Sequence, residues 1–273
     1  MPAIPATVSK RFSTSVPKFK KVLEQARERD VNESDTVTII TDILEEVFGF
    51  DKYSEITREY AIQGTYCDLA IKTGKRIEYL IEVKAIGIDL KEPHLRQAIN
   101  YAAHEGIRWV VLTNGLIWQV HRVTLEDRIS TTKLIEFDFT EINHRKKEDQ
   151  EILFLLCKRG VSKDLIDEFY EYRQSVNRYS IAALLQTEPV VNSVRRELKR
   201  IKDGIKVTTE EIQTLIANEI LKRDVVESDA AKEANKLVQK AFKKKPRAKP
   251  KTRDKDQGAP EANKLPENYW SQF

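Results

Sequence analysis

A short apolar run that contains two opposite charges constrains the fold more than any other part of the sequence. The run is Leu80-Ile81-Glu82-Val83-Lys84-Ala85-Ile86. Side chains of a β-strand alternate between its two faces, so Glu82 and Lys84 share one face while Ile81 and Val83 share the other. Burial of an ion is costly unless a partner compensates its charge. The pattern therefore predicts a buried strand whose charged face meets other polar groups.

The preceding segment adds a second carboxylate. Tyr66-Cys67-Asp68-Leu69-Ala70-Ile71 has the pattern of a strand with one acid, and Thr73-Gly74-Lys75 has the composition of a turn. This turn folds the two strands together and brings Asp68 close to Glu82. Two carboxylates about 4–5 Å apart repel each other unless a cation lies between them. Mg²⁺ suits that position, and Mn²⁺ accepts the same carboxylate and water ligands.

A helix expected over residues 92–104 carries two further polar groups. Gln97 and Tyr101 stand at i and i+4, which places them on one helix face, from which they can donate to a phosphate or order water. Lys84 can orient or deprotonate an attacking water and stabilise the charge of a phosphorane. The candidate catalytic residues are Asp68, Glu82, Lys84, Gln97 and Tyr101.

The pattern Glu-x-Lys alone is not specific. Glu197-Leu198-Lys199 also matches it, but in a helical segment where the first and third residues point to different faces. The full set is rarer, because it falls in the order strand, turn, strand and helix. The alternative is an exposed sheet face with a Glu–Lys ion pair, which contributes about 0–1 kcal/mol.

Residues 17–145 alternate helical and strand patterns. Asn32 is a candidate N-cap and Gly49 a stop for the first helix in this region. The expected helices span 34–48 and 92–104, and the expected strands span 52–60, 65–72, 77–86, 109–112, 116–123 and 133–139. This order predicts an α/β domain, a mixed β-sheet flanked by helices.

The rest of the chain divides into three regions. Residues 1–16 are expected to form a flexible lead, residues 146–242 an all-helical region, and residues 243–273 a disordered basic tail. In the helical region, Asn177 is a candidate cap, and Thr208 with Glu211 forms a capping-box pattern. The expected helices there cover 148–159, 163–174, 178–186, 188–204, 209–223 and 230–242. The simplest interpretation is a bundle that supports the first domain, and dimerisation or DNA contact are the alternatives.

The net charge of +4 is unevenly distributed. Residues 243–255 hold eight basic residues and one Asp, a charge of +7, so the other residues sum to −3. One interpretation is a solvated tail. The other is binding to nucleic-acid phosphates with release of counterions.

Several classes of protein are excluded. No apolar run reaches the roughly 18 residues of a membrane helix, and residues 1–12 lack the apolar core of a signal peptide. Two cysteines do not make a disulfide framework or a metal motif. No P-loop motif is present, which argues against ATP as a cofactor. We therefore expect a cytoplasmic protein without membrane contact.

These residues resemble the PD-(D/E)xK nuclease superfamily, and more closely the N-terminal nuclease domain of type I restriction enzyme R subunits. The resemblance covers about residues 30–140. Its matching pieces are Asn32-Glu33, Val47-Phe48-Gly49-Phe50, Cys67-Asp68-Leu69-Ala70, Ile81-Glu82-Val83-Lys84, Gln97-Ala98-Ile99-Asn100-Tyr101 and Val111-Leu112-Thr113-Asn114-Gly115, followed by Trp118. The fold that it implies is a restriction-endonuclease-like sheet over residues 17–145.

The resemblance implies a role for each matching residue. Asp68, Glu82 and the backbone carbonyl of Val83 would bind the metal, and Lys84 would assist the water. Gln97 and Tyr101 correspond to the Gln-x-x-x-Tyr motif of the family. Glu33 matches the place of a helix carboxylate that often joins the metal site, although a first-turn acid also stabilises a helix by itself. Unlike type I R subunits, this chain shows no helicase motor.

The sequence thus predicts a Mg²⁺-dependent deoxyribonuclease of endonuclease type, with a role in restriction, defence or repair. Its partner would be DNA, and a homodimer through the helical region or a protein partner are further alternatives. A second hypothesis is a non-catalytic module that binds nucleic acid or a partner on the same fold. A third is a helical scaffold with a vestigial nuclease-like domain.

Overall fold

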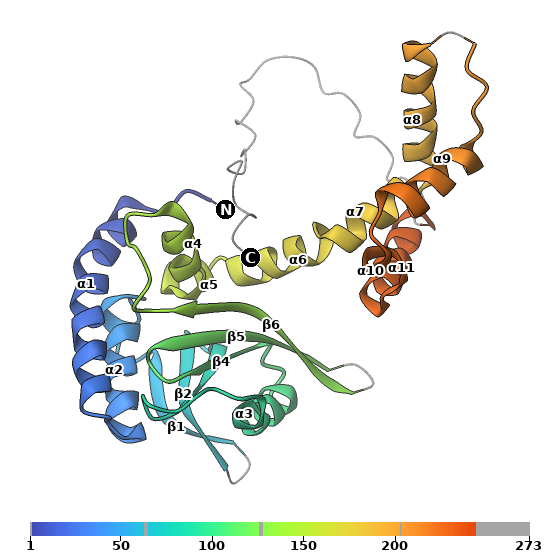
Figure 1. Cartoon of the computed structure of the whole chain (residues 1–273). Coiled ribbons are helices and arrows are strands. Elements are labelled where there is room, and N and C mark those ends of the chain that lie inside the picture. Colours follow the sequence, from blue (N-terminus) through green and yellow to red (C-terminus); the bar gives the residue numbers. More distant parts are fainter. Residues whose placement is uncertain (1, 63–64, 126–127, 203, 244–273) are drawn as a thin grey trace, which may run out of the picture. The chain divides into compact units, whose positions relative to one another are not determined.

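The computed structural model describes residues 2–62, 65–125, 128–202 and 204–243. Two compact units divide the chain between Glu168 and Phe169. The first unit holds the sheet and its flanking helices, and the second is helical (Figure 1). Residues 244–273, which include nearly all of the predicted basic tail, lie outside the described residues.

A mixed β-sheet forms the centre of the first unit, as the sequence predicted. Its strands follow one another in chain order, and β3 and β4 pair in parallel while the other neighbours are antiparallel. The strands are β1 (Ile56–Ile62), β2 (Thr65–Thr73), β3 (Arg76–Val83), β4 (Trp109–Thr113), β5 (Ile117–Leu125) and β6 (Ile129–Asp138). Helix α3 (Glu92–His104) makes the crossover that a parallel pair requires, and its bounds coincide with the predicted helix.

The N-terminal segment differs from the prediction of a flexible lead over residues 1–16. Ala6–Glu28 forms a single helix, α1, which contains Pro17. Its buried side chains recur at helical spacing: Val8, Phe12, Val16, Phe19, Leu23 and Ala26. Burial of this apolar stripe, at about 25 cal/mol per Å² of apolar surface, favours the helix despite the proline.

Helices cover the sheet on its two faces (Figure 1). Helix α2 (Glu33–Glu46) packs with α1 and contacts β3. On the other face, Leu95 and Ala98 of α3 pack with Leu80 of β3 and Leu112 of β4. Strand β3 is therefore buried on both faces, which is the environment that its apolar sequence indicated.

Two short helices complete the first unit. The predicted helix 148–159 is divided into α4 (Lys147–Leu156) and α5 (Lys158–Val161), because Cys157 adopts an extended conformation. Serine is a residue type that favours helix N-caps, but the hydroxyl of Ser162 donates to the carbonyl of Lys158 in α5 instead. Helix α6 (Leu165–Ser175) follows and continues past the division between the units.

The second unit confirms the predicted all-helical region. It contains α7 (Arg178–Leu185), α8 (Glu188–Ile201), α9 (Thr209–Leu215), the π-helix η1 (Ile216–Ile220), α10 (Arg223–Glu227) and α11 (Asp229–Lys243). Asn177 accepts hydrogen bonds from the N–H groups of Tyr179 and Ser180, and Thr208 and Glu211 form the predicted capping box. Val191, Ile212 and Ile216 form a small core that joins α8, α9 and η1.

Candidate active site

The two predicted metal-binding carboxylates lie on neighbouring strands. In the antiparallel register Leu69 pairs with Ile81, which places Asp68 of β2 at the level of Glu82 of β3. An Oδ atom of Asp68 accepts a hydrogen bond of 2.7 Å from the backbone N–H of Val83. The hairpin that the sequence predicted therefore brings these residues together.

Lys84 lies between the acidic groups. Its Nζ is 2.8 Å from Oε1 of Glu82, 2.8 Å from the carbonyl oxygen of Val83 and 3.5 Å from Oε2 of Glu33. Its backbone N–H donates to the carbonyl of Thr113 on β4 at 2.9 Å, which holds the residue in line with the sheet. Glu82 and Lys84 are therefore in contact, as expected for side chains two residues apart on one face of a strand.

Burial controls the proton affinities of this cluster. It raises the pKa values of Asp68 and Glu82 above their ordinary range, although the Val83 N–H and the Lys84 ammonium oppose the shift. Burial by itself lowers the pKa of Lys84, but the hydrogen bond and charge of Glu82, with the charges of Glu33 and Asp68, more than offset it. The net pKa of Lys84 is therefore raised, and the ammonium form is held in place.

Helix α2 brings Glu33 to the same place. Asn32 caps the helix, since its side chain accepts a hydrogen bond of 2.9 Å from the N–H of Asp35. Glu33 is the first helical residue, and its half-exposed carboxylate reaches Lys84. The structure thus places Glu33 beside the predicted site, where a first-turn charge also favours the helix.

Gln97 and Tyr101 form a separate pair. Nε2 of Gln97 donates to the hydroxyl of Tyr101 at 2.8 Å and to the carbonyl of Tyr66 at 3.1 Å. Tyr66 precedes Asp68 by two residues, so the pair ties α3 to the strand that carries the acid. Among the described residues, neither side chain is hydrogen-bonded to Glu82 or Lys84.

The chemistry of the donor atoms suits a hard divalent cation. The carboxylates of Asp68 and Glu82 and the carbonyl of Val83 are oxygen ligands of the type that Mg²⁺ prefers. In this structure the Lys84 ammonium contacts two of these oxygens. The described part of the chain contains no group of three or more His, Cys, Asp or Glu side chains arranged to hold a metal ion. A cation bound here would compete with Lys84 for these two oxygens.

A cavity of about 310 Å³ opens beside Asp68 and Glu33. Arg58 and Glu59 of β1 also line it, and sequence reasoning did not single them out. Glu59 has a φ of +46°, a conformation that side chains other than glycine rarely adopt and that concentrates at functional sites. Their only signal in the sequence is their place in the strand before the one that carries Asp68.

The comparisons with known proteins agree with the geometry of the first unit. Residues 39–135 match the family described as type I restriction enzyme R protein N terminus (HSDR_N). This match confirms the resemblance that the sequence motifs indicated, over the segment from α2 to β6. It includes all the predicted catalytic residues, and Glu33 lies outside it. No curated protein and no solved structure matches the chain.

Proposed function

We propose that this protein is a cytoplasmic, metal-dependent nuclease of endonuclease type that hydrolyses DNA phosphodiester bonds in restriction, defence or repair. The observation that carries the proposal is the contact cluster of Asp68, Glu82, Val83 and Lys84 at the β2–β3 pair. The match to the R protein N terminus supports the same function. DNA is therefore the proposed partner.

Each residue of the cluster has a proposed task. Asp68, Glu82 and the Val83 carbonyl would hold Mg²⁺ or Mn²⁺, with Glu33 at the rim. The bound ion would polarise the phosphate and lower the pKa of a water. Lys84, once released from Glu82, would orient that water and donate to a phosphate oxygen. Arg58 would contact the phosphate that enters the adjacent cavity, and the Gln97–Tyr101 pair would fix the position of β2.

Replacement of Lys84 by Ala should reduce DNA cleavage about 10²- to 10³-fold, because the site loses a donor to the charge that develops in the transition state. The same variant should still bind Mn²⁺, since it loses no oxygen ligand and loses a competing cation. We would incubate linear, circular and single-stranded DNA with Mg²⁺, Mn²⁺ or EDTA, and measure Mn²⁺ binding by calorimetry.

Lys75 provides the control for this variant, since it lies in the turn between the same two strands. Lys75→Ala should cleave as the wild type does. Full cleavage by Lys84→Ala would contradict the mechanism. If the wild type does not cleave with any metal but still retains DNA in a gel shift, the result would contradict the proposed nuclease activity.

The metal-free protein should be less stable above the pKa values of its buried acids. Because the pKa values of Asp68 and Glu82 are raised on folding, the folded state binds protons more tightly than the unfolded chain. Their ionisation therefore lowers stability as the pH rises, and this loss disappears below the ordinary Asp value of 3.8. In EDTA at pH 8, Asp68→Asn should thus unfold at a higher urea concentration than the wild type, with a smaller difference at pH 5.

Mg²⁺ should make the wild type more stable than Asp68→Asn, which reverses their order in EDTA, because the ion stabilises only the folded protein that retains its ligands. Asp89→Asn, at an exposed position outside the cluster, serves as the control and should respond to Mg²⁺ as the wild type does. A wild type whose urea midpoint does not change with Mg²⁺ or Mn²⁺ at pH 8 would argue against metal binding at Asp68.

One observation favours a second candidate function. Lys84 pairs with Glu82 and with the Val83 carbonyl, and these contacts would equally stabilise the sheet of a non-catalytic module that binds nucleic acid or a partner. Such a module would bind DNA equally well in EDTA and in Mg²⁺. The cleavage and metal-binding measurements above separate the two functions.

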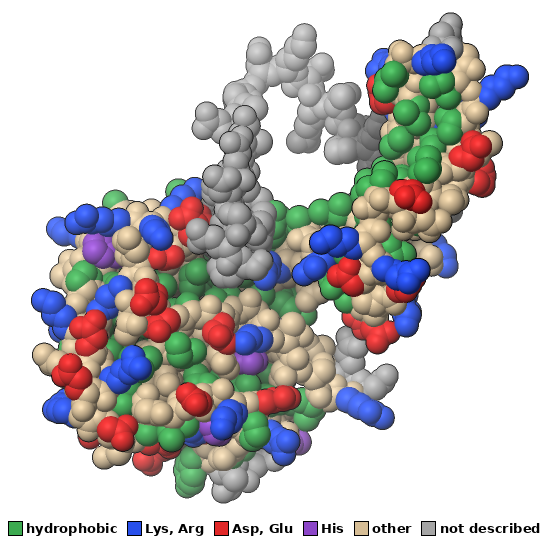
Figure 2. Space-filling model, in the orientation of Figure 1, with side chains coloured by type: hydrophobic (Ala, Val, Ile, Leu, Met, Phe, Trp, Pro, Cys, Tyr) green, Lys and Arg blue, Asp and Glu red, His purple; other side chains and the backbone are tan. Residues whose placement is uncertain are grey.

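The helical unit carries the proposed protein contacts. Ile201, Leu215 and Ile220 are each more than half exposed, and Figure 2 shows hydrophobic side chains gathered along α8. Contiguous exposed apolar patches are typical of interaction surfaces. We therefore propose this unit for self-association or for a protein partner. In the described part of the chain, none of the helices has the length and apolar character needed to cross a membrane.

A further inference from the structure

A second cavity lies at the far end of α2 from Glu33. Its volume is about 500 Å³, and its lining comes from the start of α1, the loop after α2 and the region of α5. The lining residues are Pro5, Arg11, Gly49, Lys158, Arg159, Ser162 and Lys163. Helix α2 has 14 residues, a length of about 21 Å, so this cavity is distinct from the candidate active site.

Arg11 is held rigidly at the wall of this cavity. Its Nε donates to the carbonyl of Val47 at 2.8 Å, and Nη2 donates to the carbonyl of Phe48 at 3.2 Å. Gly49 has a φ of +80°, and a Cβ atom there would lie 2.2 Å from Nη1 of Arg11. A glycine is therefore required both for the backbone and for the guanidinium beside it. The partners of Arg11 are neutral groups, so within the described residues no carboxylate balances its charge.

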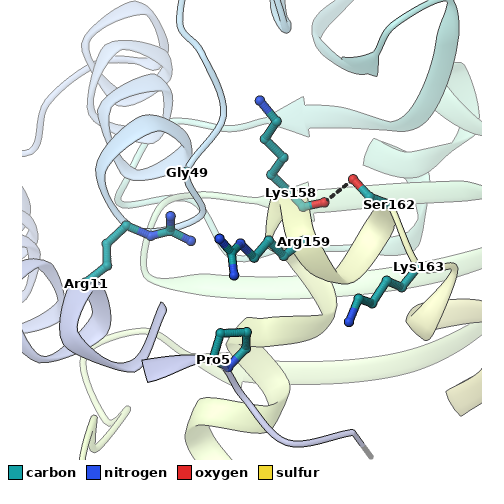
Figure 3. Close-up of a pocket in the computed structure, with 7 residues that line it drawn as sticks. All are labelled: Pro5, Arg11, Gly49, Lys158, Arg159, Ser162 and Lys163. Atoms are coloured by element: carbon teal, nitrogen blue, oxygen red, sulfur yellow. Dashed lines mark hydrogen bonds between the residues drawn. The ribbon is translucent and has the colours of Figure 1, made fainter. Parts of the chain in front are cut away.

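Two more cations share the cavity with Arg11. Arg159 and Lys163 are exposed, and neither side chain has an ion-pair or hydrogen-bond partner within the described residues. Figure 3 shows the guanidinium groups of Arg11 and Arg159 pointing toward each other. Lys158 differs, because it forms an ion pair of 2.7 Å with Glu55. The cavity therefore holds three cations whose mutual repulsion an anion would relieve.

We propose that this cavity binds a phosphate group through Arg11, Arg159 and Lys163. Guanidinium groups match the geometry of phosphate oxygens and bind them in pairs, and a lysine adds a mobile point charge. Because Arg11 is already fixed by the backbone and by Gly49, little order is lost at that residue when the anion binds. The phosphate belongs either to a free compound, such as pyrophosphate or a nucleotide, or to a DNA backbone. This site does not depend on the proposed nuclease activity.

Calorimetry on the full chain, in EDTA to prevent cleavage, tests the proposal with three probes: pyrophosphate, ATP and a short DNA duplex. The test variant is the double substitution Arg159→Gln with Lys163→Gln, which removes the two exposed cations and keeps Arg11. The control is Lys21→Gln with Arg29→Gln, which removes the same charge from exposed positions on and after α1. Thermal unfolding of both variants checks that the fold is retained.

If the ligand is a free phosphate compound, pyrophosphate or ATP should bind the wild type and the control. Binding to the test variant should be at least about tenfold weaker. If the ligand is a DNA backbone, only the duplex should bind. The test variant should then bind the duplex more weakly, and the slope of log K against log salt should be smaller by about one to two. Equal behaviour of the test variant and the control with all three probes would overturn the proposal. Because cleavage is not measured, this result is independent of the nuclease proposal.

Discussion

Glu82→Gln is expected to reduce metal-dependent DNA cleavage by on the order of 10³-fold or more, while the fold is retained. The substitution keeps the size of the side chain and its ability to accept a hydrogen bond from Lys84. It removes the negative charge that a divalent cation requires. Glu82 is 7% exposed, and its Oε1 lies 2.8 Å from Nζ of Lys84, so its carboxylate is a buried part of the cluster.

Glu78→Gln is a closely matched control for this substitution. Glu78 lies four residues earlier on the same strand and is equally buried at 7%. Its partners are Arg76 and Thr73, away from the candidate site. Cleavage should survive in this variant, with loss of stability as the main effect. Equal loss of activity in both variants would point to damage of β3 in general, and full activity of Glu82→Gln would contradict the proposed metal ligand.

Trp118→Ala is expected to destabilise the first unit by about 3–5 kcal/mol, the largest stability effect that we predict. Trp118 is fully buried at the centre of an aromatic cluster. Its ring stacks on Phe137 at 6.1 Å and meets Phe48 edge-on at 5.5 Å. Its Nε1 donates to the carbonyl of Gly115 at 2.9 Å, which also holds the β4–β5 turn. Its loss leaves a cavity that joins β5, β6 and the end of α2.

Urea unfolding followed by circular dichroism measures this effect. Tyr53→Ala is the control, because Tyr53 is 93% exposed and its removal should change the free energy of unfolding by less than about 0.5 kcal/mol. Trp118→Phe should lie between the two, since it keeps most of the apolar volume and loses the hydrogen bond. A change below about 1 kcal/mol for Trp118→Ala would show that the aromatic cluster is not central to the core.

Much of the first unit follows from local patterns. The period of two in β3 placed Glu82 and Lys84 on one face, and the structure puts them in contact. Asn32 was predicted to cap α2 from its position before an apolar helical stripe, and it does so. The helix over residues 92–104 was predicted to its ends, and the structure places Pro93 in its first turn and Gly106 just beyond its last residue. These features depend on neighbours within a few residues, so short sequence patterns are sufficient to predict them.

Two other features of the first unit were not predicted from the sequence. Residues 6–28 form one helix although Pro17 lies inside it, because burial of its apolar stripe against the first unit outweighs the missing hydrogen bond. The helix after residue 146 divides at Cys157, where Gly160 packs so closely that an added Cβ would lie 1.9 Å from the carbonyl oxygen of Phe154. The apolar residues at helical spacing are a local signal for the first helix, whereas the close approach of Gly160 to Phe154 is visible only in the folded chain.

The sequence by itself determined the type of sheet, the order of the candidate active-site residues and the helix caps at Asn32, Asn177 and Thr208. All of these depend on the alternation of apolar and polar residues and on single residues at helix ends. Only the tertiary structure decided that Lys84 contacts Glu82 and Val83, that Arg58 and Glu59 line the cavity beside Asp68, and that Arg11 faces Arg159. The physical reason is that burial and electrostatic contact act between groups that folding brings together, whatever their separation along the chain.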